Sequence, residues 1–457
     1  MSFNSLHFFF YVFAVFICYL LVRPTWRAWI ILIASLFFFG YHSVLALVLI
    51  LCVTLVVFLA THITFNLRLT TAIGVVFLLT FLIALKVLAS DFGDHNQIIS
   101  VVAVLGSSYY ILQAIGYLID IRDQKFQLIP NFKSTLLFLG FFPQAPAGPI
   151  HRASELLPQI GFRETPSLAR IVCSLKVILW GYFCKLIIAD KIYYIITPIF
   201  STVDAQDGST LAISAILYSL QIYFDFYAYT QIAIGIASLF GVSFTDNFNQ
   251  PYLAISFREF WRRWHISLSR WLRDYVYIRL GGRTNSPIRF LLVVLATFVL
   301  SGLWHGIGQC FILWGVLHAI LYFTEDRISR SIVAKKLDHF RLTGIIRRIL
   351  FLALVTLTWL VFRSTSLSEL LDILTRIFQP WHFSTMMEMF NSPNWLFVCI
   401  APLIILFQFD ATKLPVIHGN SKNVTEYLLE YLFVTGCLLL IAIFGGLGTP
   451  EFLYFSF

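Results

Sequence analysis

The sequence SVLALVLILCVTLVVFLATHI occupies residues 43–63 and contains no Asp, Glu, Lys or Arg. At 1.5 Å per residue, a helix of this length crosses the roughly 30 Å hydrocarbon core of a bilayer. Within lipid, a helix pairs its own backbone N–H and C=O groups, which an open strand cannot do. The stretch therefore predicts a transmembrane helix.

The same pattern recurs along the chain. Of its 457 residues, 59% are hydrophobic and only 12% are charged, about half the roughly 25% charged residues of a soluble domain. The other apolar runs are 3–22, 28–41, 71–90 and 97–121, with further ones near 170–200, 209–240, 290–304, 307–324, 346–363, 393–408 and 426–446. We predict an all-α polytopic membrane protein with about 11 transmembrane helices.

Residues 134–150 are apolar but too short to span a bilayer, and Pro143, Pro146 and Pro149 each remove a backbone donor. A re-entrant hairpin buried in protein is expected there. Basic residues alternate between successive connections, which predicts an N-terminus outside and residues 122–133 in the cytoplasm.

The net charge of +9 resides in short connections between apolar runs, as expected for a membrane protein, so nucleic-acid binding is not predicted. The seven cysteines lie in or beside apolar runs without CxxC pairs. Neither disulfides nor a metal site are expected. The first residues lack a basic region and a small-residue cleavage site, so we expect a retained first span.

Residues 259–282, EFWRRWHISLSRWLRDYVYIRLGG, interrupt the apolar pattern. One stripe at helical spacing contains Trp261, Trp264, His265, Leu268, Leu272 and Tyr275. This predicts a single amphipathic helix, in the plain interpretation one that lies in the membrane interface. The seven arginines between residues 258 and 283 could also attract a polyanionic cosubstrate such as a nucleotide-bearing thioester. The two interpretations are compatible.

His305 lies within the apolar segment LSGLWHGIGQCFILWGVLHAILYF, residues 300–323. An ionisable side chain in such a segment is a functional-site hypothesis, because its burial is costly. A neutral imidazole can accept a proton, and Gly302 and Gly306 are expected to let a substrate approach closely. His318 is interpreted as structural. No GxSxG, P-loop or HExxH motif is present, which leaves a base acting on a hydroxyl, or transport.

Five stretches carry a resemblance to a known family. They are SSYYILQAIGYLIDI (107–121), FFPQAPAGPIHRASELLPQI (141–160), QIYFDFYAYTQIAIGIASLFGV (221–242), DNFNQPYLAISFREFWRRWHISLSRWLRDYVYIRLGG (246–282) and GLWHGIG (302–308). In this order they resemble the membrane-bound O-acyltransferase family, most of all its bacterial alginate O-acetyltransferase branch. The resemblance covers roughly residues 1–325. It implies a bundle of helices around a central funnel, within a single integral membrane domain made of N-terminal helices (1–121), a catalytic core (122–325) and C-terminal helices (326–457).

By this resemblance, His305 is the catalytic histidine and His265 the second signature residue. Residues implied to bind donor or acceptor are Tyr223, Asp225, Asn247, Asn249, Trp261, Arg262, Arg263, Trp304 and Arg152. Alternatives remain open: Asp225 could be a structural carboxylate held by an arginine, and the two asparagines could cap a helix or turn. Tyr227, Ala228 and Gln231 replace the small residues and the acid usual in the family, which implies a bulkier, less acidic wall.

The resemblance implies an enzyme of the bacterial inner membrane, in contact with membrane lipids. It would move an acyl group, with acetyl favoured, from a cytoplasmic acetyl-CoA to a hydroxyl of an extracytoplasmic polysaccharide or envelope polymer. A periplasmic partner protein and no permanently bound cofactor are implied. D-alanyl transfer from a carrier-protein thioester is the alternative within the family. A transporter or exporter with intramembrane histidines is the alternative outside it.

Overall fold

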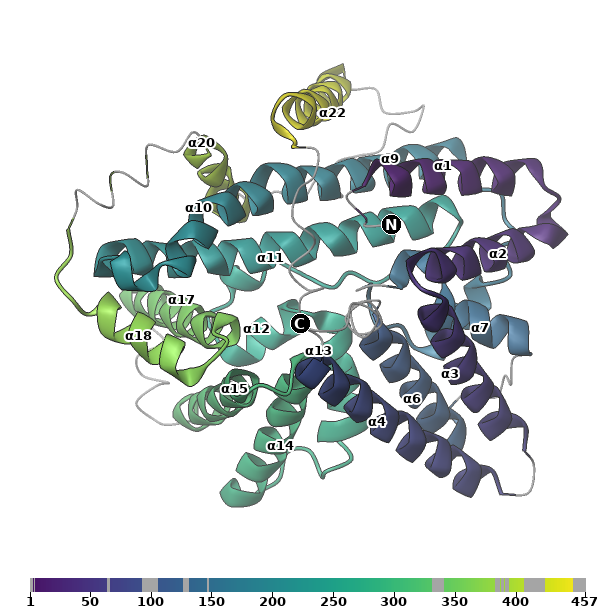
Figure 1. Ribbon diagram of the computed structural model, residues 1–457, viewed down its shortest axis with the longest axis horizontal. Coiled ribbons are helices and arrows are strands. Elements are labelled where there is room, and N and C mark those ends of the chain that lie inside the picture. Colours follow the sequence, from purple (N-terminus) through teal and green to yellow (C-terminus); the bar gives the residue numbers. More distant parts are fainter. Residues whose placement is uncertain are drawn as a thin grey trace. The chain divides into compact units, whose positions relative to one another are not determined.

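The computed structural model describes residues 3, 5–63, 66–92, 106–125, 131–145, 148–330, 341–382, 387, 390, 394–406 and 424–446. Over these residues the chain forms helices joined by turns, with no β-strand (Figure 1). The predicted all-α fold is confirmed. Residues 97–105, 126–130, 146–147 and 407–408, on which parts of the predicted spans, hairpin and connections fall, lie outside this description.

The chain divides into two compact units. The first contains Met1–Phe183, Ala228–Asp246 and Ala411–Phe457, and the second contains Cys184–Tyr227 and Asn247–Asp410. Each unit is thus assembled from separate parts of the chain. The division into residues 1–121, 122–325 and 326–457 stays a prediction.

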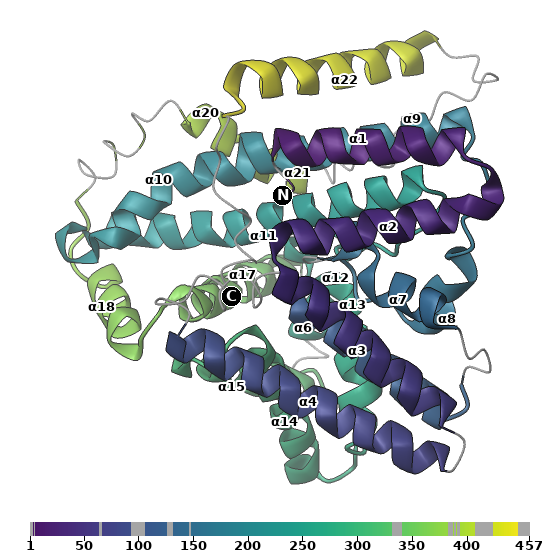
Figure 2. The same ribbon diagram turned by 45° about the vertical axis from the view of Figure 1, so that its right-hand side comes forward.

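The first unit is built from α1 (Leu6–Leu21), α2 (Pro24–His42), α3 (Val44–His62), α4 (Leu67–Phe92), α6 (Ser107–Arg122), α7 (Phe132–Gly140), α8 (Ala153–Leu156), α9 (Leu168–Phe183), the end of α11 (Gly208–Leu239) and α22 (Val424–Phe444). Helices α3 and α4 run side by side (Figure 2). Helices α9 and α11 approach each other closely at Gly181 and Gly235. A Cβ atom at Gly181 would lie 2.9 Å from the Ala228 carbonyl oxygen, and a Cβ atom at Gly235 would lie 2.9 Å from the Ser174 carbonyl oxygen. Such small residues let membrane helices pack closely.

The second unit is built from the π-helical turn η3 (Cys184–Ala189), α10 (Asp190–Ser201), most of α11, α12 (Phe257–Arg263), α13 (Ile266–Leu272), the π-helical turn η6 (Arg273–Tyr277), α14 (Pro287–His305), α15 (Gln309–Ile328), α17 (Arg341–Arg363), α18 (Leu367–Ile377), α20 (Trp395–Val398) and α21 (Ile400–Leu406). Helices α14 and α15 form a tight hairpin (Figure 1). A Cβ on Gly315 would lie 2.5 Å from the Phe298 carbonyl oxygen. Only glycine permits this approach, so it fixes where α14 places its last turn.

In the described part of the chain, seven helices are long and apolar enough to cross a membrane. They are Pro24–His42, Val44–His62, Leu67–Leu88, Leu168–Ser201, Gly208–Leu239, Pro287–His305 and Gly344–Arg363. Their outer faces carry exposed apolar side chains such as Ile33, 61% exposed, and Leu292, 58% exposed. A water-facing helix would not expose so many, so the chain is a multi-pass membrane protein. The described spans number fewer than the predicted 11, and three shorter apolar helices, Leu6–Leu21, Trp395–Ile405 and Glu430–Phe444, accompany them.

The predicted re-entrant segment begins as α7 and turns at a short 3₁₀ helix, Phe142–Gln144. The Gln144 side chain donates to the Phe138 carbonyl at 2.6 Å and lies 3.3 Å from the Gln113 amide. These bonds satisfy polar groups where the proline-rich segment cannot continue a helix. How deeply the segment enters the membrane stays a prediction.

Candidate active site

The chain bends at His265. Helix α12 ends at Arg263, His265 has a left-handed backbone with φ +43°, and α13 begins at Ile266. The prediction of one continuous amphipathic helix over residues 259–282 is therefore wrong. A left-handed conformation at a residue other than glycine costs about 1–3 kcal/mol and persists only where the surroundings enforce it.

Asn247 enforces the bend from a loop 18 residues earlier in the chain. Its backbone carbonyl accepts from Ile266 N at 2.9 Å, and its Oδ1 accepts from Ser267 N at 3.0 Å and Ser267 Oγ at 2.9 Å. These bonds serve the first amides of α13, which a bent chain would otherwise leave unsatisfied. Asn247 therefore caps the start of α13, one of the two alternatives left open for it, and its contact with a substrate stays a prediction.

The same oxygen sets the tautomer of His265. Asn247 Oδ1 must be an acceptor, because it accepts from the Ser267 backbone amide. His265 Nδ1 lies 3.3 Å from it and must carry the proton, which makes Nε2 the acceptor nitrogen of the ring. Burial lowers the pKa of His265 to about 3. The imidazole is therefore neutral at any physiological pH.

His305 is the last residue of α14 and is 5% exposed. Its ring packs against those of Trp304, Phe362 and Trp314, with centroids 4.8, 5.0 and 5.5 Å away. The Trp304 ring also lies 5.9 Å from that of His265. Trp304 thus contacts both predicted catalytic histidines, and the structure brings all three residues together in one aromatic cluster.

The glycines that flank His305 do not open a path to it. A Cβ at Gly302 would overlap the Phe311 carbonyl, and one at Gly306 would overlap the Phe311 ring. The prediction that these glycines admit a substrate is wrong, since α15 of the protein itself occupies the space. Their role is to seat the α14–α15 hairpin.

A cavity of about 520 Å³ lies beside this cluster. It is lined by Arg258, Trp261, Arg262, Ile266, Ser269, Arg270, Leu272, Arg273, Tyr277, Arg283, Phe290, Val294, Thr297, Phe298, Ser301 and Tyr322. We call it the arginine cavity, because five of these residues are arginines and no described lining residue is an acid. Helices α12 and α13 both contribute to its wall, so the bend at His265 shapes it.

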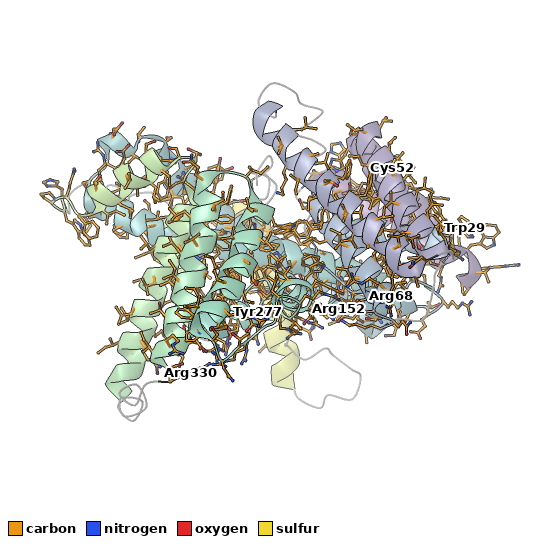
Figure 3. The ribbon with its side chains drawn as sticks, turned by 90° about the horizontal axis from the view of Figure 1, so that it is seen from below. Trp29, Cys52, Arg68, Arg152, Tyr277 and Arg330 are labelled. Carbon is orange, nitrogen blue, oxygen red and sulfur yellow. The ribbon has the colours of Figure 1, made fainter. Side chains whose placement is uncertain are left out.

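Two carboxylates hold part of this arginine cluster in place. Asp326, 2% exposed, pairs with Arg258, with Arg283 at 2.8 Å and with Arg330 at 2.9 Å. Asp274 pairs with Arg273 at 2.7 Å. Tyr277 and Arg330 mark this side of the unit in Figure 3. Five lining arginines against two acids leave the cavity positive, which suits a ligand with several negative charges.

The inner end of the cavity lies close to His305 without including it. Ser301, a lining residue, precedes His305 by one helical turn on α14. The Trp261 ring, also in the wall, lies 5.8 Å from Trp314, whose ring contacts His305. His305 is not among the described lining residues; it lies four residues beyond Ser301, about 6 Å along the helix axis.

Several buried polar atoms surround this inner end. Ser301 Oγ, Trp261 Nε1, Trp314 Nε1 and both ring nitrogens of His318 have no hydrogen-bond partner in the described part of the protein. The His318 ring lies 4.7 Å from that of Trp314 and 5.1 Å from that of Trp261. Buried polar groups ordinarily have partners, so these atoms are candidates for hydrogen bonds to water or to a ligand. The sequence predicts a structural role for His318 and does not single out Ser301; its position four residues before His305 on one helix face is the signal that points to it.

The remaining predicted residues have other surroundings. Asp225 pairs with Lys185 at 2.7 Å, and Lys185 also pairs with Asp190 at 2.8 Å. Asp225 is thus a buried carboxylate held by a lysine rather than by the arginine that we considered. Tyr223, 5% exposed, packs against Phe248 with ring centroids 5.7 Å apart.

The structure separates the four polar residues that remain. Arg262 lines the arginine cavity, whereas Arg263 pairs with Glu259 at 2.8 Å and donates to the Asn249 carbonyl at 3.1 Å. Asn249 acts through its backbone, since its N–H donates to the Arg263 carbonyl at 2.9 Å. Arg152 belongs to the first unit, where it precedes α8.

The fold is that of an all-helical, multi-pass membrane protein. Its candidate site has two buried histidines beside an arginine-lined cavity, which suits an anionic ligand. Residues 122–368 match the model of the MBOAT, membrane-bound O-acyltransferase, family. This match covers more than half of the chain and includes both histidines and every residue that lines the arginine cavity. The chain belongs to the membrane-bound O-acyltransferase family.

Three relatives illustrate the range within the family. The chain is 33% identical over 296 residues to the probable alginate O-acetylase of Azotobacter vinelandii, covering 65% of this chain and 57% of the relative. It is 32% identical over 307 residues to the peptidoglycan O-acetyltransferase of Helicobacter pylori, covering 62% and 58%. It is 29% identical over 242 residues to the teichoic acid D-alanyltransferase of Bacillus subtilis, covering 50% and 60%. The chain thus spans somewhat over half the length of these relatives.

Proposed function

We propose that the chain is an O-acyltransferase that moves an acyl group from a thioester donor to a hydroxyl, with His305 as the general base. The proposal rests on the position of His305 one helical turn beyond Ser301, which lines a cavity together with five arginines. An anionic donor bound by those arginines would place its thioester end toward the histidine.

The proposed reaction needs one base. His305 accepts the hydroxyl proton while the hydroxyl oxygen forms a bond to the thioester carbonyl carbon. The tetrahedral intermediate then collapses, the carbon–sulfur bond breaks, and His305 returns the proton to the thiolate. General base catalysis contributes roughly 10²- to 10⁴-fold, so His305 would supply a large part of the acceleration.

His265 and Trp304 act as positioning residues in this proposal. The neutral His265 ring contacts Trp304, which in turn contacts His305. A ring held by Asn247 in one tautomer keeps Trp304 in place and so limits the orientations of His305. Preorganisation of this kind keeps a base within reach of its proton.

The donor that fits the arginine cavity carries phosphates and an amide-containing arm. Arginines bind phosphates through paired N–H donors, and the partnerless polar atoms of Ser301 and Trp261, which line the cavity, would bond the amides of such an arm. Acetyl-CoA has both features, and two of the three relatives described above are named as O-acetylating enzymes. We therefore favour acetyl-CoA as donor, used as a substrate and supplied from the cytoplasm.

The proposed acceptor is a hydroxyl of a polysaccharide or another envelope polymer on the far side of a bacterial inner membrane. In this proposal the N-terminus lies outside, and a periplasmic partner protein completes the transfer. The names of the relatives, which refer to alginate, peptidoglycan and teichoic acid, support a polymer acceptor. A second candidate donor is a D-alanyl thioester on a carrier protein, favoured by the similarity to the D-alanyltransferase of Bacillus subtilis.

Transfer of a labelled acyl group tests the proposal. Membranes with the wild-type chain are incubated with labelled acetyl-CoA or, separately, with a labelled D-alanyl carrier protein, and polymer-bound label is measured. We expect acetyl label in the polymer, and its loss by at least 100-fold in His305→Ala. Retained activity in His305→Ala would contradict its assignment as the base. If the polymer acquires label only from the D-alanyl carrier protein, the carrier and not acetyl-CoA is the donor.

A further inference from the structure

A second cavity, of about 1070 Å³, lies in the first unit. Its wall contains three cations, Lys133, Arg163 and Arg170, together with apolar residues such as Leu137 and Phe240. We call it the lysine–arginine cavity, after Lys133, Arg163 and Arg170. It is independent of the proposed acyl transfer, because every described residue of its wall belongs to the first unit.

The cavity lies where membrane-crossing helices begin and end. Pro24, in its wall, is the first residue of α2, and Gly241 follows the end of α11 by two residues. Arg170 lies in the first turn of α9. Since α2, α9 and α11 all belong to candidate spans, their shared end is where hydrocarbon gives way to lipid headgroups.

Exposed aromatic residues lie at the same end of α2, where the hydrocarbon region meets the lipid headgroups. Trp26 and Trp29, in the first turns of α2, are 59% and 44% exposed. Exposed tryptophans are typical of the membrane–water interface. The Lys133 ammonium lies 4.7 Å from the centre of the Trp29 ring. This cation–π contact holds a positive charge at headgroup depth.

Three cations face one acid in the wall. Arg170 is fixed by its Nε, which donates to the Ser238 carbonyl at 3.0 Å, and by a terminal nitrogen 3.2 Å from Ser243 Oγ. Lys133 and Arg163 also line the cavity, and Glu164 is the only acid among its described lining residues. The wall therefore retains a net positive charge, which favours a ligand with a negatively charged phosphate.

Apolar surface continues from the cavity along the helices. Leu168 and Leu175 on α9 are 76% and 52% exposed, and Leu21 at the end of α1 is 81% exposed. These side chains face hydrocarbon in a membrane-spanning chain. A ligand with a phosphate and long acyl chains would satisfy both surfaces, whereas a free phosphate would leave the apolar surface without a partner.

We propose that the lysine–arginine cavity binds the phosphate of an anionic phospholipid, with its acyl chains along α1, α2 and α9. Basic pockets between membrane helices bind such headgroups by general electrostatics. The proposal concerns lipid recognition alone and stands whether or not the acyl-transfer proposal holds.

Native mass spectrometry of the full-length protein in detergent tests it, with phosphatidylglycerol added at increasing concentration. The variant is Lys133→Glu with Arg163→Glu, and the matched control is Arg68→Glu, an exposed arginine of the same unit outside the cavity wall (Figure 3). We expect at least a tenfold weaker retention of phosphatidylglycerol in the double variant and wild-type retention in the control. Thermal unfolding of each variant reports whether it is folded, and Lys133→Gln with Arg163→Gln replaces the reversal if that variant unfolds.

Two further titrations separate the sources of phosphate. Phosphatidylcholine, which carries no net charge, should be retained at least tenfold less than phosphatidylglycerol. Inorganic phosphate at millimolar concentration should not displace the lipid. Equal retention by variant and wild type, equal retention of the two lipids, or displacement by inorganic phosphate would each overturn the proposal.

Discussion

The two basic cavities of the protein differ in the residues that adjoin them. The arginine cavity of the second unit ends at Ser301, one turn from His305, and partnerless polar atoms surround that end. The lysine–arginine cavity of the first unit lies beside exposed lipid-facing leucines and contains no histidine among the described residues of its wall. Positive charge alone thus does not define a donor site. The two cavities are distinguished by their neighbours: a candidate base adjoins the arginine cavity, and lipid-facing side chains adjoin the lysine–arginine cavity.

The wall of each cavity is also held in a different way. The arginine cavity depends on a left-handed His265 fixed by Asn247, a residue of another loop. The lysine–arginine cavity depends on the ends of long helices and on Arg170, which donates to Ser238. A change at Asn247 should therefore affect only the first of the two, and this difference can be measured.

The largest effect is expected from Asn247→Leu. This substitution removes the acceptor of two buried donors of Ser267 and of His265 Nδ1. A buried donor left unsatisfied costs about 1–3 kcal/mol, so we expect destabilisation by about 3 kcal/mol in thermal unfolding and loss of acyl transfer. Asn249→Leu is the control, because its backbone bonds remain, and it should change stability by less than about 0.5 kcal/mol. Equal stability of the two variants would contradict the role of Asn247.

Reversal of two cavity arginines should have the next largest effect. Charged hydrogen bonds contribute about 1.5–3 kcal/mol each, so Arg262→Glu with Arg270→Glu should raise the donor KM by about 100-fold and change kcat little. The measurement is initial-rate kinetics with acetyl-CoA. Arg279→Glu, an exposed arginine that does not line the cavity, is the matched control. An unchanged KM in the double variant would leave the bent α12–α13 segment an interfacial structure only.

A pH-dependent effect follows from His265. Burial lowers the pKa of this histidine from 6.5 to about 3, so the unfolded chain takes up a proton at a higher pH than the folded chain. The contribution of the neutral ring to stability is complete above pH 6.5 and decreases as the pH falls toward 3. At pH 5 the loss is on the order of 2 kcal/mol. Between pH 7.5 and 5, the midpoint temperature of thermal unfolding should fall more steeply in the wild type than in His265→Gln. Parallel curves for the two proteins would contradict the neutral state assigned to His265.

The smallest effect should come from the other cavity. Lys133→Glu with Arg163→Glu changes the charge of the first unit and touches no described residue of the arginine cavity wall. In detergent with saturating phosphatidylglycerol we expect a donor KM within about twofold of wild type, since the walls of the two cavities share no described residue. A large rise in this KM would show that the two cavities are not separate in function.

Local patterns in the sequence predicted much of this. Apolar runs located the long helices, and the unusual setting of His305 points to a candidate base, which stays a proposal. The arginine content of residues 258–283 also anticipated a positive site. Each of these features depends on residues close together in the chain, where helical spacing decides which side chains share a face.

The errors arose from contacts between distant residues. The bend at His265 is fixed by Asn247, 18 residues away, and nothing in the spacing of residues 259–282 reveals it. The glycines beside His305 serve Phe311 of the next helix, and Asp225 is held by Lys185, 40 residues earlier. Such tertiary partners override local pattern, because a buried polar group or a close backbone contact is satisfied by whatever the fold brings near.

The central claim is that the arginine cavity presents a thioester donor to His305. The most direct measurement is photo-crosslinking with a coenzyme A analogue whose acyl group carries a photoreactive diazirine, followed by mass spectrometry of the labelled peptides. We predict labelling of the α14 segment from Ser301 to His305, prevented by excess coenzyme A and greatly reduced in Arg262→Glu with Arg270→Glu. Labelling confined to peptides outside the second unit, or insensitive to coenzyme A, would contradict the account.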